Sequence, residues 1–222
     1  MVSEVIESKM KKIILTVVAC ALLAQVGTAR AECAAECTNP PPQDRFVDNN
    51  NGTISDTCTG LQWEKKTAPG TGGLHDVNNR YLWSADTKWE PNGSVFTHFL
   101  YGLNADQIKF ENHNAIIGCF GNHCDWRLPT FVELSSIVDK SVCISGGRFN
   151  GHPCINAIFG PTQPNAFQGP EVTSYWSAST FANLRDATAN IDFYSGSMVG
   201  GGKSFIPDYA RAVRCGDLRL SK

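Results

Sequence analysis

The sequence has no large excess of either charge and, beyond residue 31, no long apolar run. Its 222 residues include 19 Lys and Arg against 21 Asp and Glu, which gives a net charge of −2 at pH 7. This balance excludes the generally basic surface that is typical of nucleic-acid-binding proteins. A membrane-spanning helix needs about 20 apolar residues, so none is expected after residue 31. With 42% hydrophobic residues, the chain can still form a globular core.

The short motifs of common catalytic sites are also missing. The chain contains no Gly-x-Ser-x-Gly, no His-Glu-x-x-His and no phosphate-binding loop, and each of these chemistries needs its residues at such a spacing. Its 20 glycines follow no collagen-like repeat, so a collagen-type stalk is excluded. We therefore expect a non-catalytic protein without a cofactor or a metal.

Residues 1–31 have the pattern of a secretory signal peptide. Lysines precede an apolar run over residues 13–26, and small residues follow as far as Ala31. We expect cleavage after Ala31 and an exported protein in the periplasm, at the cell surface or outside the cell. In an alternative interpretation, residues 17–20 form a lipobox and Cys20 carries a lipid, but the apolar stretch continues past Cys20.

Cysteines are abundant for a chain of this length. Cys20 leaves with the signal peptide, and an even number in an exported chain predicts a disulfide framework. The candidates are Cys33, Cys37, Cys58, Cys119, Cys124, Cys143, Cys154 and Cys215. Proximity along the chain predicts the pairs Cys33–Cys37, Cys119–Cys124 and Cys143–Cys154, and elimination leaves Cys58–Cys215. Zinc binding by Cys119, His123 and Cys124 is an alternative, but an oxidising compartment favours disulfides.

The predicted secondary structure consists of short elements between long loops. Two β-prone runs around Asn51-Gly52 predict a hairpin over residues 45–56, and residues 61–64 alternate like a half-buried strand. Apolar spacing predicts an amphipathic helix over residues 95–110. Thr130 and Glu133 form a capping box, so a second helix should begin just after Thr130.

Further strands are expected near the C-terminus. Residues 175–179, 189–193 and 209–215 have strand-like composition, whereas Gly200-Gly201-Gly202 predicts a flexible turn. We predict one α+β domain over residues 44–216. It follows a Pro- and Cys-containing arm, residues 32–43, and precedes a short tail, residues 217–222.

Five motifs occur in a characteristic order. They are Gly52-Thr53, Thr59-Gly60-Leu61-Gln62-Trp63, Asp125-Trp126-Arg127-Leu128-Pro129-Thr130, Tyr175-Trp176-Ser177 and Val213-Arg214-Cys215. In this order they resemble the bacterial domain-of-unknown-function family that includes the C-terminal domain of the Legionella collagen-like protein. The Trp-Arg-Leu-Pro-Thr block followed by a helix is the most specific part of the resemblance.

This resemblance implies a C-type-lectin-like fold, which is also shared with formylglycine-generating enzymes. Such a fold has an antiparallel sheet, two helices and long loops, here stapled by disulfides. Members of the family are typically exported, and some serve in adhesion to host glycans. The motif residues are expected to be structural, with Arg127 paired to a nearby carboxylate: Trp63, Trp126, Arg127, Leu128, Pro129 and Trp176.

Trp83, Lys88 and Trp89 are the candidate ligand-binding residues, because they lie in a polar loop where rings can stack on a sugar. Arg211 and Arg214 are candidates for added local positive charge. Glu90-Pro91-Asn92 matches a tripeptide of calcium-dependent lectins, but it lies too early in the chain, and Pro91-Asn92-Gly93 favours a turn.

Three functional hypotheses follow. The first is an exported, non-catalytic domain that binds a glycan or a surface protein. We expect no nucleic-acid partner. The second is a structural or assembly protein of the envelope that holds a protein partner. An enzyme of unknown class is a third hypothesis that the missing motifs disfavour.

Overall fold

The computed structural model describes residues 37, 43–105, 107–111, 114–145, 148–149, 151–163 and 174–216. The expected signal peptide, most of the arm and the C-terminal tail lie outside these residues, so those three assignments stay predictions.

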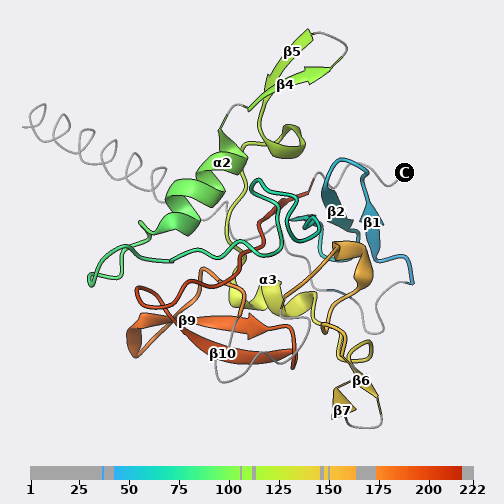
Figure 1. Cartoon of the computed structure of the whole chain (residues 1–222). Coiled ribbons are helices and arrows are strands. Elements are labelled where there is room, and N and C mark those ends of the chain that lie inside the picture. The colour runs from blue at the N-terminus through green and yellow to red at the C-terminus, as the bar shows by residue number, and fades with distance from the viewer. Residues whose placement is uncertain are drawn as a thin grey trace, which may run out of the picture.

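The first sheet brings the two ends of the domain together. Its strands are β1 (Phe46–Asp48), β2 (Thr53–Asp56), β3 (Leu61–Glu64) and β11 (Val213–Cys215). Their order is β1-β2-β3-β11 and every pair is antiparallel. The early hairpin of β1 and β2 is therefore confirmed (Figure 1). The last strand lies directly beside β3.

The second sheet contains β8 (Thr180–Phe181), β9 (Leu184–Asp192) and β10 (Ser197–Gly202) in the antiparallel order β10-β9-β8. The prediction of a turn at the three glycines is wrong, because they form the second half of β10. The expected strand at residues 175–179 is reduced to isolated bridges, in which Tyr175 pairs with Ile191 and Tyr209.

Two small hairpins project from the body in Figure 1. They are formed by β4 (Gln107–Glu111) with β5 (Asn114–Gly118), and by β6 (Ile144–Ser145) with β7 (Arg148–Phe149). The strand β4 occupies part of the helix that we expected over residues 95–110. The helical part consists of η1 (Val95–Leu100) and α2 (Tyr101–Asn104), and it ends where Ala105 adopts an extended backbone.

The second predicted helix is confirmed as α3 (Phe131–Ser136). The backbone N–H of Glu133 donates to Thr130 Oγ1 over 3.2 Å, and the N–H of Thr130 donates to Glu133 Oε2 over 2.8 Å. This reciprocal capping box satisfies two N–H groups that the first helical turn leaves unpaired. Single 3₁₀ turns form η2 (Phe120–Asn122) and η3 (Ala157–Phe159). The α+β class is thus confirmed.

The tryptophans of the family motifs lie in the core. Trp63, Trp126 and Trp176 are at most 3% exposed and belong to the two hydrophobic clusters of the core. The guanidinium of Arg127 donates to both carboxylate oxygens of Glu133, over 2.8 and 2.6 Å. This bidentate ion pair ties the motif to the first turn of α3.

The disulfide pattern differs from the prediction in two of the four predicted pairs. Cys119–Cys124 and Cys143–Cys154 are confirmed. Cys58, however, pairs with Cys37, so the predicted pairs Cys33–Cys37 and Cys58–Cys215 are wrong. Cys215 is also disulfide-bonded.

Proximity along the chain did not predict the Cys37–Cys58 pair, because the β1–β2 hairpin folds the chain back. Cys58 follows β2, and the N–H of Thr57 in the same turn donates to the carbonyl of Arg45. The hairpin thereby returns Cys58 to the point where the arm enters the domain. Disulfides of this number fit a protein that folds in an oxidising compartment.

Within the described residues, no helix combines the length and the apolar character needed to cross a membrane.

Candidate ligand-binding pocket

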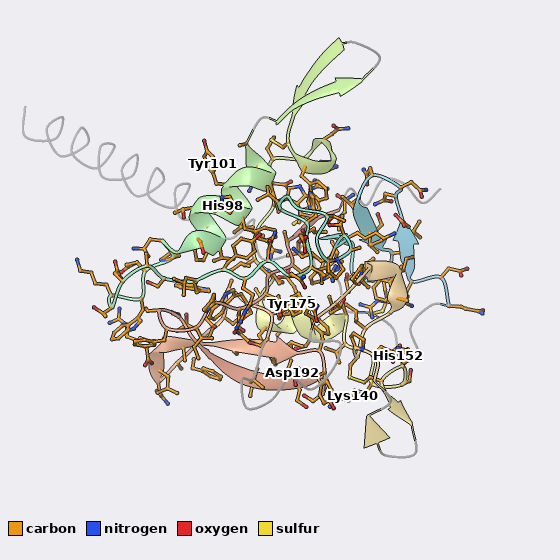
Figure 2. The ribbon with its side chains drawn as sticks, viewed as in Figure 1. His98, Tyr101, Lys140, His152, Tyr175 and Asp192 are labelled. Atoms are coloured by element: carbon orange, nitrogen blue, oxygen red, sulfur yellow. A yellow bond between two sulfur atoms is a disulfide. The ribbon has the colours of Figure 1, made fainter. Side chains whose placement is uncertain are left out.

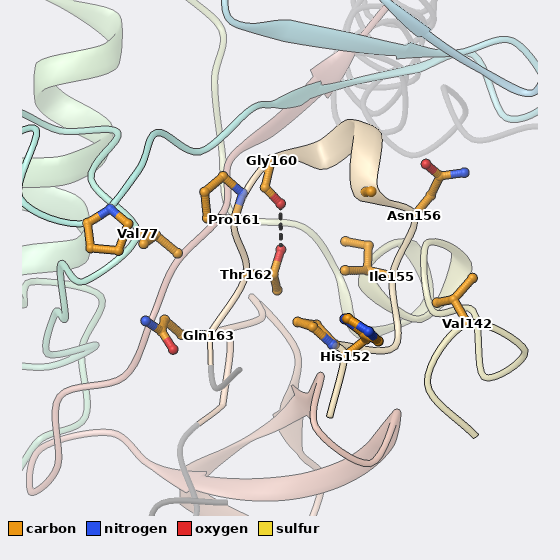
Figure 3. A pocket seen from close by; sticks show the side chains of 12 residues that line it. Val77, Val142, His152, Ile155, Asn156, Gly160, Pro161, Thr162 and Gln163 are labelled. Carbon is orange, nitrogen blue, oxygen red and sulfur yellow. Dashed lines mark hydrogen bonds between the residues drawn. The ribbon is translucent and has the colours of Figure 1, made fainter. Parts of the chain in front are cut away.

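A pocket of about 770 Å³ opens between the loop that follows β3 and the segments on both sides of the Cys143–Cys154 disulfide (Figure 3). Its size matches that of small-molecule sites, which occupy roughly 300–1,000 Å³. The lining residues are mostly apolar or uncharged: Pro69, Val77, Val142, His152, Pro153, Ile155, Asn156, Ala157, Gly160, Pro161, Thr162 and Gln163.

One wall of the pocket is held by a close approach of two backbones. The N–H of Lys66 donates to the carbonyl of Phe159 over 3.2 Å. Gly160 has a φ of +76°, and a Cβ atom there would lie 2.4 Å from the carbonyl oxygen of Lys66. Only glycine fits this position, since any side chain would be both strained and in collision with the backbone.

The rim is fixed by the Cys143–Cys154 disulfide, both of whose cysteines are fully buried. The N–H of Cys154 donates to the carbonyl of Phe193 over 2.7 Å, and the N–H of Asp139 donates to the carbonyl of Cys154 over 2.9 Å. These contacts hold the His152–Pro153 part of the rim against the end of β9. Figure 2 shows His152 on the opposite side of the molecule from His98 and Tyr101.

The polar groups of the pocket are hydrogen-bonded into the fold. Thr162 Oγ1 donates to the carbonyl of Gly160, as Figure 3 shows, and accepts from Arg211 Nη2 over 3.0 Å. The N–H of Gln163 donates to Tyr175 Oη over 3.0 Å, and its Nε2 donates to Asn78 Oδ1 over 3.1 Å. The polar wall is therefore preorganised.

Charge is scarce at the surface of the pocket. Among its described lining residues, His152 is the only one whose side chain can carry a charge. A sulfated or phosphorylated ligand needs several cations, preferably arginines. The lining instead suits a neutral ligand that combines an apolar face with a few hydrogen-bonding groups.

Behind this wall lies a buried cluster of charged residues. Arg211 is fully buried and donates to the carbonyls of Glu64 and Phe159 over 2.7 and 3.0 Å. Its guanidinium also lies 5.9 Å from the ring centre of Tyr175. Burial raises the pKa of Tyr175 to about 12 despite the nearby guanidinium, so the phenol stays neutral.

Glu64 anchors the same cluster. Its Oε1 accepts from Lys66 Nζ and His75 Nδ1, each over 2.8 Å, and its Oε2 accepts from the N–H of Ala212 over 3.1 Å. Burial alone would raise the pKa of Glu64, but Lys66 and His75 outweigh it and lower the pKa to about 2. The carboxylate thus links β3 to the loop that carries Pro69 and Val77, and we assign it a structural role.

The predicted ligand-binding residues do not meet at this pocket. Trp83 is only 6% exposed, and its indole Nε1 donates to the carbonyl of Ser177 over 3.2 Å. Lys203 Nζ lies 4.1 Å from its ring centre, and Phe96 packs edge-on against it. These neighbours occupy the Trp83 ring, so it belongs to the core rather than to a sugar-stacking surface.

Lys88 and Trp89 remain in a separate surface loop, where Lys88 is exposed and Trp89 is half-buried. Asn92 closes this loop, because its Oδ1 accepts from the N–H of Ala85 and its Nδ2 donates to Asp86 Oδ2. The side-chain amide of Asn92 therefore forms its hydrogen bonds within the loop, which supports the interpretation of Glu90-Pro91-Asn92 as a turn. In the described part of the chain, no cluster of residues could hold a metal ion.

Neither C-terminal arginine supplies surface charge, so that prediction is wrong. Arg211 belongs to the buried cluster, and Arg214 is 6% exposed. Arg214 donates to Asp125 Oδ1 and Gln62 Oε1 over 2.7 and 2.8 Å. Both side chains form buried hydrogen bonds that hold β11 and the segment before it in place.

No sequence pattern predicts the pocket itself. Its residues come from two loops that lie far apart in the chain, and neither loop contains a recognisable motif. The prolines of both segments and the Cys143–Cys154 pair indicated only irregular structure.

Fold and pocket together define an α+β domain, stapled by disulfides, that offers an uncharged cavity of ligand size. The chain belongs to the Lcl C-terminal domain family, whose model matches residues 52–214. The family predicted from the five motifs is therefore confirmed. Comparison with curated proteins and with solved structures gives no match.

Proposed function

We propose that this chain is an exported, non-catalytic ligand-binding domain with a C-type-lectin-like fold, and that the pocket is its ligand site. The observation that carries the proposal is the preorganised cavity of about 770 Å³. Its polar groups are held by buried partners such as Arg211, so binding requires little reordering of the protein.

Three features support the C-type-lectin-like fold. The first and last strands share one antiparallel sheet, the loops between them are long, and disulfides staple those loops. Each is expected of a C-type-lectin-like domain, although architecture alone does not carry function.

The ligand class that we propose is a neutral glycan. A sugar ring has an apolar C–H face, for which Val77, Ile155 and Pro161 offer complementary surface. Its hydroxyls can bond to Asn156 and Gln163 at the rim. The shortage of charge in the lining argues against sulfated polysaccharides.

A glycan array tests this proposal. The oxidised, exported protein is applied to neutral and sulfated glycans near 0.15 M salt, where long-range charge attraction is largely screened. We expect selective binding to neutral glycans. Binding that follows only sulfate content, or none by a folded protein, contradicts the proposal; capture of one stoichiometric envelope protein would then favour the structural hypothesis.

A further inference from the structure

The strand β10 forms an open edge of the second sheet. It pairs with β9 on one side only, and its sequence, Ser-Met-Val-Gly-Gly-Gly, contains neither charge nor proline. Proteins usually protect an exposed edge with lysine, proline, a bulge or a very short strand. The opposite edge follows this rule, because β8 has two residues and a register shift, whereas β10 has six residues.

The register of β10 against β9 shows which backbone groups of β10 point away from the sheet. The N–H of Lys203 donates to the carbonyl of Asp186, so Lys203 and alternate residues before it face β9. Met198, Gly200 and Gly202 therefore direct their N–H and C=O groups away from the sheet. No hydrogen bond of the described structure reaches these groups.

Two of the three glycines in β10 are not required by the fold. At Gly201, a Cβ atom would lie 2.2 Å from Asn190 Nδ2 and 2.7 Å from Trp176 Cζ3, so packing demands glycine. At Gly200 and Gly202, the nearest atoms would lie at ordinary contact distances of 3.8 and 3.7 Å. A Cβ atom would thus be accommodated at both positions without collision.

Apolar side chains accompany this edge. Of the eight large hydrophobic residues that are exposed in the described structure, four lie in this sheet or the turn after it: Leu184, Met198, Phe205 and Ile206. Met198 is 54% exposed and Phe205 is 70% exposed. The ring of Phe205 lies beside Gly202, on the face that Met198 shares.

We propose that β10 pairs with β10 of a second copy of this chain, antiparallel and with Gly200 on the two-fold axis. This register matches Gly200 to itself and Met198 to Gly202 of the partner subunit, so every outward N–H and C=O group gains a partner. The Met198 side chain then covers the glycine and reaches Phe205 of the partner subunit, a favourable sulfur–aromatic contact.

A second copy is the occupant that the strand itself favours. A two-fold interface must be self-complementary, and here a large side chain on each strand faces a glycine on the other. Because β10 carries no charge, two copies meet along the axis without like-charge repulsion between the paired strands.

Sedimentation of the oxidised, exported protein over a concentration series tests this proposal. We expect a concentration-dependent dimer that Met198→Lys weakens at least ~10-fold, since two lysines would enter the interface. Val132→Lys is the matched control, because Val132 is 76% exposed on α3, and it should leave dimerisation unchanged. A wild-type protein that stays monomeric, or a dimer that survives Met198→Lys, overturns the proposal.

A cross-link tests the register independently. Residues in a hydrogen-bonded antiparallel pair have Cα atoms about 5.5 Å apart, within the range of a disulfide. Gly200→Cys should therefore form a covalent dimer under mild oxidation, whereas Val132→Cys should not. Equal cross-linking of both variants, or of neither, overturns the pairing at Gly200. Melting temperatures near that of the wild type show that the variants are folded.

Discussion

At the residue scale, Gly160 shows how one position shapes the pocket. Its positive φ and its closeness to the Lys66 carbonyl are both demanded by the wall that it builds. This requirement is tertiary, because it depends on the backbone of Lys66, nearly one hundred residues earlier in the loop that follows β3. The sequence shows a glycine before a proline, which indicates a turn, but it cannot show which backbone lies opposite.

Gly160→Ala is expected to destabilise the protein by about 2 kcal/mol or more, through backbone strain and collision with the Lys66 carbonyl. Gly151→Ala is the matched control, since Gly151 also has a positive φ but has no atom near its Cβ position. Urea unfolding measures both variants. Equal losses of stability would show that the collision contributes nothing.

Glu64 makes stability depend on pH. Its folded-state pKa of about 2 lies below the ordinary value of 4.5, because Lys66 and His75 overcome the effect of burial. The carboxylate therefore stabilises the fold above about pH 4.5, and this contribution is lost as the pH falls toward 2. The free energy of unfolding, measured from pH 6 to pH 2, should decline across this window.

Glu64→Gln should remove much of that decline and cost about 3 kcal/mol at pH 7, because it leaves the buried Lys66 without its carboxylate. Asp48→Asn is the control. Its carboxylate pairs with Lys65 at the surface, and exposed pairs contribute at most about 1 kcal/mol. A Glu64→Gln variant with the wild-type pH profile would refute the role assigned to Glu64.

At the element scale, local signals predicted local structure well. The Asn-Gly hairpin and the capping box of α3 were predicted correctly because each depends on residues within one turn. The helix over residues 95–110 was predicted too long, since apolar spacing alone does not show that Ala105 becomes extended. Two disulfides were predicted wrongly, because sequence distance does not show that the β1–β2 hairpin returns Cys58 to Cys37.

The Cys143–Cys154 disulfide is expected to matter more than Cys119–Cys124. The first closes a separation of 11 residues and the second a separation of five. Loop-closure entropy predicts losses of about 3 and about 2 kcal/mol when each pair is replaced by serines. Thermal unfolding of the two double variants measures the difference. A reversed order would show that native contacts, rather than chain entropy, govern these bridges.

At the scale of the whole molecule, the pocket and the β10 edge belong to different regions. The pocket is formed by the loops after β3 and around Cys154, whereas the dimer edge lies on the second sheet. A dimer would thus carry two pockets, and two linked sites can bind a multivalent surface more tightly than either alone. The family was predictable from five ordered motifs, but the pocket was not, because its lining residues come from segments far apart in the chain.

The most direct test of the ligand site compares three proteins on the same glycan array. Ala157 is an exposed lining residue, so Ala157→Trp should fill the cavity without unfolding the chain. Val132→Trp places the same ring on the exposed face of α3. The account predicts that the wild type and Val132→Trp bind the same neutral glycans and that Ala157→Trp loses at least ~10-fold in affinity. Undiminished binding by folded Ala157→Trp would contradict the assignment of the pocket.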